Sequence, residues 1–446
     1  MTLVDNLNSF IWGLLVDWIL FLGIYLTLGL DFISLRLVPS AFVMWWQAVR
    51  HPPEGEGECG PFLNSMAALG GMIGMGNVTG VTAALIAGGP GVLVWIWIGS
   101  LVGFATKFAE TFLATRYRSH NAKGEVVGGP MYYLSQGLPR SLRWLGRVFA
   151  LFGALAVLGV GNGLQSEQIA SLLNRDLAVP PLATGVVMAA LTWWVIQGGL
   201  RRIGLWSAWL IPLSCLFYLV LCLVLVLPNI ERLPGVLGAI LGEGFKLKAM
   251  AGGTLGLTIS KGIRLGVLSN EAGLGTSPII LSAGRPGDPF YQGCISMLLS
   301  LADVVVCTAT ALVVLCCGLP LDGSDPVTLL DQAFATVLGG ASWLAILAVV
   351  PFAFTTFTAF GYYGERCLEF LLGVRSQQPF RLIWIAVVAL ASVSRHADIW
   401  EVTEVLNSMV ALPNIIGILL LSGLLVRQTR EQFARIQATH SLNPSP

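Results

Sequence analysis

Five glycines crowd one 11-residue stretch of an otherwise apolar segment, Gly70-Gly71-Met72-Ile73-Gly74-Met75-Gly76-Asn77-Val78-Thr79-Gly80. Glycine costs about 1 kcal/mol relative to alanine in a helix interior, so the cluster predicts a helix that is interrupted midway. A break exposes free N–H groups, which attract an anion, and free carbonyls, which hold a cation. One stretch could therefore bind a carboxylate and a sodium ion together. The alternative is close packing of helices through small residues.

Polar side chains also lie within apolar segments, at Gln165, Glu167, Asp303, Thr355, Thr356 and Thr358. An acid inside a membrane is costly and is a functional candidate, so Asp303 could hold a cation or a proton, or pair with a neighbouring helix. Threonine hydroxyls can bond back to their own helix and are cheaper to bury. Lys107 and Glu110 are three residues apart, which predicts a local ion pair.

The motifs of soluble enzymes are missing from the sequence. The four histidines, His51, His120, His396 and His440, are scattered, and no HExxH, paired CxxC or Walker GxxxxGK[ST] pattern occurs. We therefore expect no enzyme activity, no organic cofactor and no ATP site. A secondary transporter, which an ion gradient drives, fits the chain better.

The amino-acid composition indicates which medium surrounds most of the chain. Hydrophobic residues make up 55% of the 446 residues and charged residues only 11%, against about 25% charged residues in soluble domains. Such sparse charge predicts a lipid bilayer as the surrounding medium. The net charge of +1, without a basic block, gives no reason to expect a nucleic-acid partner. The eight cysteines form no CxxC motif and are interpreted as packing residues.

Apolar runs near 20 residues predict an all-α membrane protein with about 11 transmembrane helices. An N-terminal helix at about 10–32 and a cytoplasmic loop fill residues 1–60, a ten-helix core fills 61–428, and 429–446 form a tail. The core divides into repeats at about 61–228 and 247–428. The ten core helices are expected near 61–87, 89–117, 144–173, 182–197, 203–228, 247–268, 290–318, 342–371, 380–394 and 404–427.

Five helices in each half force the two halves into opposite orientations, the arrangement of inverted-repeat transporters. Core helix 6 carries a second glycine cluster, Gly252-Gly253-Thr254-Leu255-Gly256. Interruptions in core helices 1 and 6 occupy corresponding positions of the two halves. Paired interruptions of this kind point to a transporter's binding site.

The distribution of basic residues predicts the orientation in the membrane. With the N-terminus outside, the 25 Lys and Arg residues lie on the cytoplasmic side except for Arg175, Arg232, Lys246, Lys248 and Arg395. The longest external loop, about 319–341, then holds aspartates and no Lys or Arg. We expect the C-terminus in the cytoplasm.

Four stretches together resemble the alanine or glycine:cation symporter family. They are GMGNVTGV at 74–81 with IAGGPGVLVWIWIGSLVGFATKFAE at 86–110, VGGPMYYL at 127–134, SNEAGLGTSP at 269–278 and NSMVALPNIIGILLL at 407–421. The resemblance covers nearly the whole chain. It implies a LeuT-like fold of two inverted five-helix repeats plus one N-terminal helix, in a bacterial plasma (inner) membrane. The implied activity is sodium-driven symport of alanine, glycine or a similar small neutral amino acid into the cell.

The resemblance also implies roles for individual residues. The amides of Met75 and Gly76 would meet the substrate carboxylate. The side chain of Asn77 would lie beside substrate or ion, Gln165 would be a polar contact, and Phe360 an apolar wall. A sodium site would form from the carbonyls of Gly70 and Ile73 with the hydroxyls of Thr355 and Thr356, since sodium prefers oxygen ligands.

Four positions depart from the family's usual residues, namely Met75 for Thr, Phe360 for Trp, Leu265 for Arg and Glu167 for Asn. Met75 keeps its backbone N–H, so carboxylate binding by amides survives. Two rival functions stay open. One is a proton-coupled transporter that uses Asp303 or Glu167, and the other is a sensor or channel that keeps the fold without transport.

Overall fold

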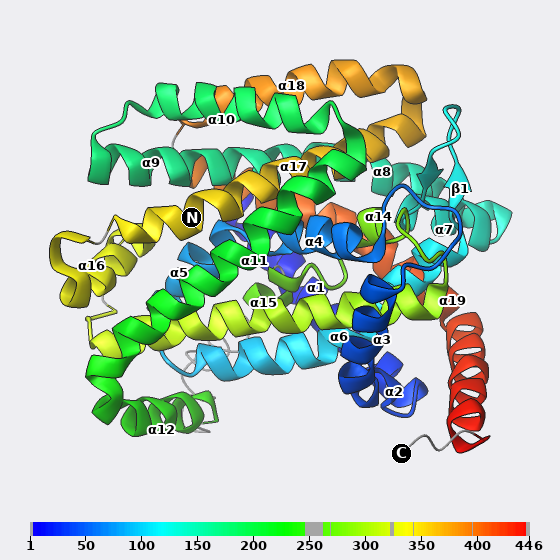
Figure 1. Cartoon of the computed structure of the whole chain (residues 1–446), viewed down its shortest axis with the longest axis horizontal. Helices are drawn as coiled ribbons and strands as arrows, with labels where there is room; N and C mark the ends of the chain where they lie inside the picture. The colour runs from blue at the N-terminus through cyan, green and yellow to red at the C-terminus, as the bar shows by residue number, and fades with distance from the viewer. Residues whose placement is uncertain are drawn as a thin grey trace.

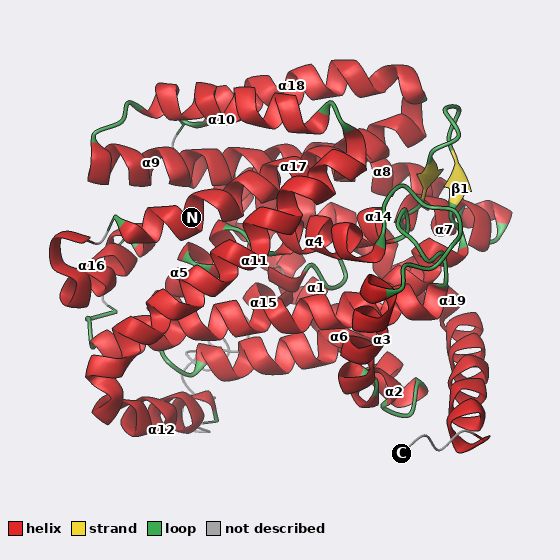
Figure 2. Ribbon diagram, viewed as in Figure 1, coloured by secondary structure: helices red, strands yellow, loops and turns green. Residues whose placement is uncertain are grey.

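A computed structural model describes residues 3–245, 262–267, 269–321, 325–341, 343–394 and 396–442 of the chain. These residues are mostly helical (Figure 2). A short antiparallel hairpin pairs β1 (Ser119–His120) with β2 (Val126–Val127). The predicted interruption at Gly252–Gly256, and most of the helix expected at 247–268, lie outside the described residues.

Every helix expected before residue 247 has a counterpart in the structure. These are α1 (Leu3–Gly29), the broken pair α4 (Pro61–Met72) and α5 (Thr79–Gly88), α6 (Val92–Arg116), α8 (Trp144–Val157) continued by α9 (Gln165–Leu177), α10 (Pro181–Ile196) and α11 (Gly199–Val226). The helices α2 (Ile33–Arg36), α3 (Val38–Arg50), α7 (Pro130–Gly137) and α12 (Leu233–Gly244) lie in segments expected to be loops.

The second half follows the same pattern. Its helices are α14 (Ser277–Leu281), α15 (Pro289–Cys317), α16 (Pro326–Leu338), α17 (Leu344–Leu372), α18 (Gln377–Ala391) and α19 (His396–Leu442). Within the described residues, six helices are long and apolar enough to cross a membrane, or seven if the broken pair counts as one span. These spans support a multi-pass membrane protein, and the expected total of about 11 stays a prediction.

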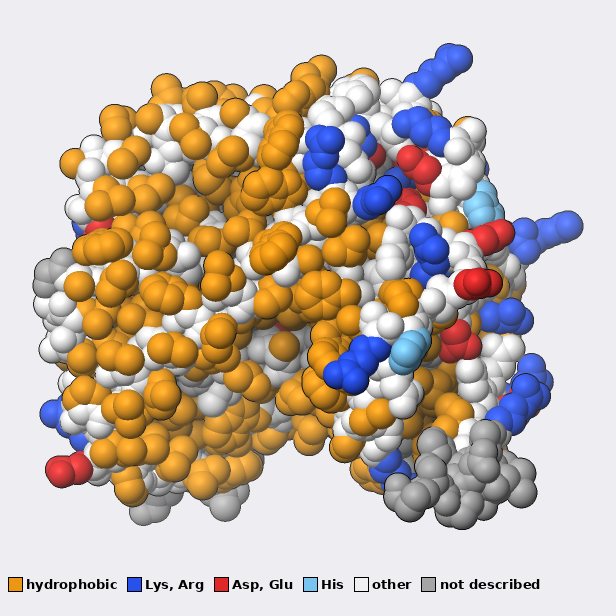
Figure 3. Space-filling view, viewed as in Figure 1, with side chains coloured by type: hydrophobic (Ala, Val, Ile, Leu, Met, Phe, Trp, Pro, Cys, Tyr) orange, Lys and Arg blue, Asp and Glu red, His pale blue; other side chains and the backbone are white. Residues whose placement is uncertain are grey.

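The long helices run side by side along the longest axis of the molecule (Figure 1). Helix α15 packs along α6, and α17 packs against α11 and α8. Hydrophobic side chains cover most of the face in Figure 3, while Lys and Arg gather toward the end that carries α7 and the β-hairpin. We call this the hairpin end. A wide apolar band with a basic end is what a bilayer-embedded bundle requires.

The first core span is broken where the glycine cluster predicted it. Helices α4 and α5 meet at an angle of 59°, joined by a short 3₁₀ turn at Met75–Asn77. Ile73 and Gly74 between them have extended backbone conformations. The prediction of an interrupted helix is confirmed.

A second irregularity faces this break. Residues Leu158–Leu164 form a π-helical segment between α8 and α9. At Gly161 a Cβ atom would lie 2.3 Å from the ring of Phe360, so only glycine allows α17 to approach this closely. A widened turn of this type commonly marks a functional site in a helix.

A buried ionic cluster ties the hairpin end together. The guanidinium of Arg366 on α17, only 4% exposed, contacts Glu125 at 2.8 Å, Glu369 at 2.7 Å and Glu58 at 3.3 Å. Glu58 precedes α4 and Glu125 belongs to the hairpin. One cation therefore connects three segments that are distant in sequence. Burial raises the pKa of Glu58 to about 7, against the opposing effect of Arg366.

We expect Glu58 to make folding stability depend on pH. The raised pKa adds about 2–3 kcal/mol to the free energy of unfolding at low pH. This gain is complete below pH 4.5 and is lost as pH rises through about 7. The wild-type protein in detergent should thus unfold at a lower temperature at pH 8 than at pH 5. In Glu58→Gln this difference should shrink, whereas the exposed control Glu54→Gln should keep it. If Glu58→Gln kept the wild-type difference in unfolding temperature between pH 5 and pH 8, Glu58 would not be its source.

Candidate functional site

The break in the first core span frees two carbonyl oxygens. In a continuous helix Gly70 O would accept from Gly74 N, and Ile73 O from Asn77 N. Instead Gly74 N donates to the side chain of Asn77 at 3.0 Å, and Asn77 N donates to Gly74 O at 3.2 Å. Both freed carbonyls turn to α17.

The hydroxyl of Thr356 meets these carbonyls. Its Oγ1 lies 3.1 Å from Gly70 O, 3.4 Å from Ile73 O and 3.0 Å from Phe352 O. A hydroxyl has one hydrogen, so it can satisfy only one of the three oxygens at a time. The remaining lone pairs form an electron-rich cluster that suits a small cation.

Two further hydroxyls border the same cluster. A Cβ atom on Gly70 would lie 2.9 Å from Thr355 Cβ and 3.2 Å from Ser207 Oγ, so both side chains pack on that glycine. Thr355 Oγ1 bonds back to Phe352 O at 2.9 Å. Ser207 on α11 is fully buried, and its Oγ has no hydrogen-bond partner. The four residues expected to hold sodium thus come together, and Ser207 is an addition that sequence reasoning missed.

A cavity of about 100 Å³ opens beside the break. Its walls include four of the five residues expected to contact substrate, Gly76, Asn77, Gln165 and Phe360. The volume is well below the 300–1,000 Å³ typical of sites for drug-sized ligands, so only a very small molecule fits. Met75 is buried, and it meets the cavity wall through its backbone, whose N–H donates to Gln165 Oε1 at 2.9 Å.

Asn77 connects the break to α15. Its Nδ2 donates to Asp303 Oδ1 at 2.5 Å and to Ser269 Oγ at 3.2 Å. Ser269 in turn donates to Asp303 at 2.8 Å. Asp303 is 1% exposed, so the structure places this intramembrane acid against neutral hydrogen-bond donors next to the cavity.

The described part of the second half contains a break of its own. Residues 262–267 and 269–270 are helical, a turn follows from Glu271, and the helix resumes at α14. Glu271, Gly273 and Gly275 all have positive φ angles. The helix expected to end near residue 268 ends at Asn270, so this turn lies in the segment expected to be a loop between helices. The interruption predicted at Gly252–Gly256 lies outside the described residues and stays a prediction.

Lys107 and Glu110 are buried beside this second break. The expected ion pair between them is replaced by other bonds, because Lys107 Nζ contacts Ser277 Oγ and Glu110 Oε1 accepts from Asn414 at 2.6 Å. The second oxygen of Glu110 has no hydrogen-bond partner. Lys107 therefore connects α14 to α6 instead of forming a close ion pair with Glu110.

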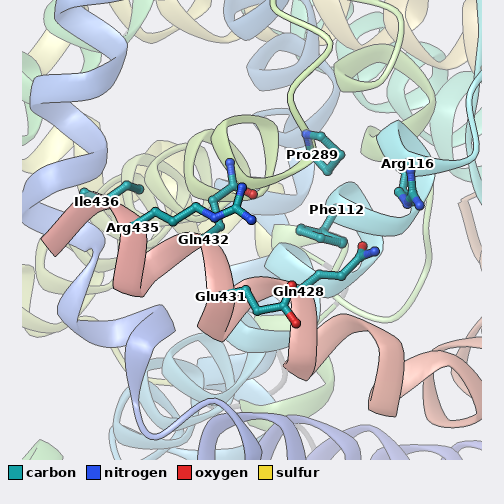
Figure 4. A pocket seen from close by; sticks show the side chains of 8 residues that line it. All are labelled: Phe112, Arg116, Pro289, Gln428, Glu431, Gln432, Arg435 and Ile436. Atoms are coloured by element: carbon teal, nitrogen blue, oxygen red, sulfur yellow. The ribbon is translucent and has the colours of Figure 1, made fainter. Parts of the chain in front are cut away.

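A larger hollow of about 630 Å³ lies elsewhere, among the ends of α6, α15 and α19. Figure 4 shows its wall of Gln428, Glu431, Gln432 and Arg435 on α19, facing Phe112 and Arg116 of α6. None of the residues at the helix breaks lines it. Size alone would favour this hollow, but the convergent polar groups favour the smaller cavity as the site.

The pattern of a broken helix, a cation cluster and a small cavity has a counterpart among known proteins. The profile of the sodium:alanine symporter family matches residues 1–444. The chain belongs to this family. The resemblance inferred from the sequence motifs is therefore confirmed, and the protein is a sodium-coupled secondary transporter of the membrane.

Two relatives are similar to this chain over nearly its whole length. The sodium/alanine symporter AgcS of Methanococcus maripaludis is 36% identical over 439 residues, which are 96% of each chain. The probable sodium/glutamine symporter GlnT of Bacillus subtilis is 30% identical over 431 residues, 94% of this chain and 88% of GlnT.

A solved structure supports the fold independently. The crystal structure of MhsT in complex with L-phenylalanine matches with a TM-score of 0.55 at 16% identity, covering 82% of this chain and 90% of MhsT. MhsT has the LeuT fold, so the expected fold class is confirmed.

Two glycines within the break should respond differently to alanine. A Cβ on Gly74 would lie 2.7 Å from Thr356 Oγ1, whereas a Cβ on Gly76 would meet nothing within 4 Å. We expect Gly74→Ala to lower the free energy of unfolding by about 1–3 kcal/mol, and Gly76→Ala to change it by about 0.5 kcal/mol or less. Thermal unfolding of both variants in the same detergent checks this. Equal destabilisation would show that the close approach at Gly74 is not tight.

Proposed function

We propose that this protein carries a small neutral amino acid such as alanine or glycine into the cell together with sodium. The observation that carries the proposal is the convergence of α4 and α17 at a cluster of oxygens, directly beside a cavity of about 100 Å³. A cation at the cluster would stabilise the broken backbone that also forms the cavity wall. Ion and substrate would then share one structural element.

The proposed sodium ligands are the carbonyls of Gly70 and Ile73 with the hydroxyls of Thr355 and Thr356. Ser207 is a fifth candidate because its unpartnered hydroxyl borders Gly70. A cation here would turn the Thr356 hydrogen away and accept lone pairs from Gly70 O, Ile73 O and Thr356 Oγ1. All proposed ligands are oxygens, as a hard cation prefers.

The proposed substrate site is the cavity itself. Gln165 Oε1 accepts the hydrogen bond of Met75 N, and a carboxylate oxygen would accept that same bond with a full negative charge. We infer that the substrate carboxylate replaces Gln165 there, with Gly76 N–H and the Asn77 side chain adjacent. Phe360, seated on Gly161, closes the apolar side and leaves room only for a short side chain.

Asp303 is the place for a second coupling ion. Its carboxylate is buried against Asn77 and Ser269, and a buried charge must be paired or neutralised. Sodium would neutralise it in a sodium symporter, and a proton would do so in the rival proton-coupled function. The proposed orientation has the N-terminus outside and the hairpin end in the cytoplasm, in a plasma (inner) membrane.

Uptake into proteoliposomes tests the function directly. An inward sodium gradient should drive accumulation of labelled alanine, and replacement of sodium by choline at constant pH should abolish it. Uptake that survives in choline and follows a proton gradient would support proton coupling. Sodium-dependent binding without uptake would indicate a sensor. Failure of alanine, glycine and serine alike would contradict the proposal.

The sodium site predicts a contrast between two threonines of α17. Thr356→Ala removes a proposed ligand and should raise the sodium concentration for half-maximal alanine binding by about tenfold or more. Thr358→Ala is the matched control, since Thr358 is equally buried and donates only to Thr355 O of its own helix. Scintillation binding of alanine against sodium concentration gives both values. An unchanged sodium dependence in Thr356→Ala would remove this residue from the site.

A further inference from the structure

Glu271 enters the cavity from the second helix break. It is 2% exposed and lines the cavity together with Gly76, Gln165 and Phe360. Among the described residues of the cavity wall, no other side chain is ionisable. Leu265, from the segment just before this break, lines the same wall and supplies no charge.

One oxygen of this carboxylate is left without a partner. Thr276 Oγ1 donates to Glu271 Oε2 at 2.7 Å, while Oε1 is buried and accepts no hydrogen bond. An unpartnered carboxylate oxygen inside a protein is expensive, at about 1–3 kcal/mol or more. Its position on a cavity wall indicates a donor that arrives with a ligand.

The backbone holds Glu271 in this position at a cost. Its φ angle is +56°, a left-handed conformation that non-glycine residues rarely adopt. The turn is supported by Leu274 N donating to Glu271 O at 3.2 Å and by the Asn270 side chain accepting from Ala272 N at 2.9 Å. Strained residues that the surrounding structure over-determines cluster at binding sites.

The balance of buried charge points to a cationic group on the ligand. Lys107 lies within electrostatic reach of three acids, Glu110, Glu271 and Asp303. Lys107 Nζ contacts Ser277 Oγ, and no ion pair within the described residues joins it to Glu271. A buried carboxylate without a charged partner is strongly unfavourable, and a cationic group of the ligand would neutralise Glu271.

We propose that Glu271 binds the ammonium group of the transported amino acid and so makes the site selective for amines. This rests on the proposed function, which places the substrate carboxylate on the first helix break. The zwitterion then lies between the two breaks, with its carboxylate at the amides of Met75 and Gly76 and its ammonium group at Glu271. Each half of the fold recognises one charge of the substrate.

The experiment compares alanine with lactate, which has a hydroxyl group in place of the ammonium group on the same carbon skeleton. Affinities are measured by displacement of labelled alanine at saturating sodium and pH 7. The wild type should strongly prefer alanine. In Glu271→Gln alanine binding should weaken about 100-fold while lactate binding does not, so the preference collapses. Glu110→Gln, equally buried but outside the cavity, should keep the wild-type preference.

Glu271→Asp keeps the carboxylate but shortens the side chain by one methylene group. It is the variant to test if Glu271→Gln does not fold. It should weaken alanine binding without changing lactate binding. A wild-type preference in a folded Glu271→Gln or Glu271→Asp protein overturns the proposal, as does an equal collapse in Glu110→Gln. A Glu271 variant whose alanine binding no longer depends on sodium, but which still prefers alanine to lactate, also overturns the proposal. That result would assign Glu271 to the ion site. Failure of the proposed function is a different result, because the wild type would then bind none of the small amino acids.

Discussion

Backbone groups inside a bilayer must be satisfied within the protein, and this constraint shapes the site around the broken first core span. The break leaves Gly70 O and Ile73 O without their helical partners, and the lipid of a bilayer offers no donors to replace them. Thr356 can donate to only one oxygen at a time. The surplus of lone pairs is what a cation would resolve, so the need to satisfy the backbone and the need to bind an ion are met by the same atoms.

The glycines serve this arrangement in two ways at once. The sequence offered helix interruption and close packing as alternatives, and the structure contains both. Gly74 carries the extended backbone of the break, and its missing side chain also lets Thr356 approach to where a Cβ would lie 2.7 Å away. Gly161 likewise admits Phe360 against the π-helical turn. Breaking a helix without clearing space beside it would leave the freed carbonyls out of reach of α17.

Features with a local signal could be predicted, and features set by tertiary context could not. Apolar length located the helices, and five glycines in one span located the break. The residues of the proposed sodium cluster were named from the family resemblance, and their oxygen atoms suit a sodium ion. Ser207 was missed because a serine in an apolar helix has no distinctive pattern, and only its contact with Gly70 and its unpartnered hydroxyl single it out. Glu271 was missed because its exposure to a cavity depends on a turn whose left-handed backbone the sequence does not display.

Asn77 shows how binding at the two breaks can be coupled. Its side-chain oxygen accepts from Gly74 N at the first break, and its amide nitrogen donates to Asp303 on α15 and to Ser269, which adjoins the second break. A cation at Asp303 would fix the Asn77 amide, and the Asn77 amide holds the turn whose N–H groups would face the substrate carboxylate. Because such coupling is reciprocal, an amino acid that orders the turn must strengthen ion binding by the same factor. The helix break is therefore the element through which the energy of an ion gradient can act on the substrate, without direct contact between distant sites.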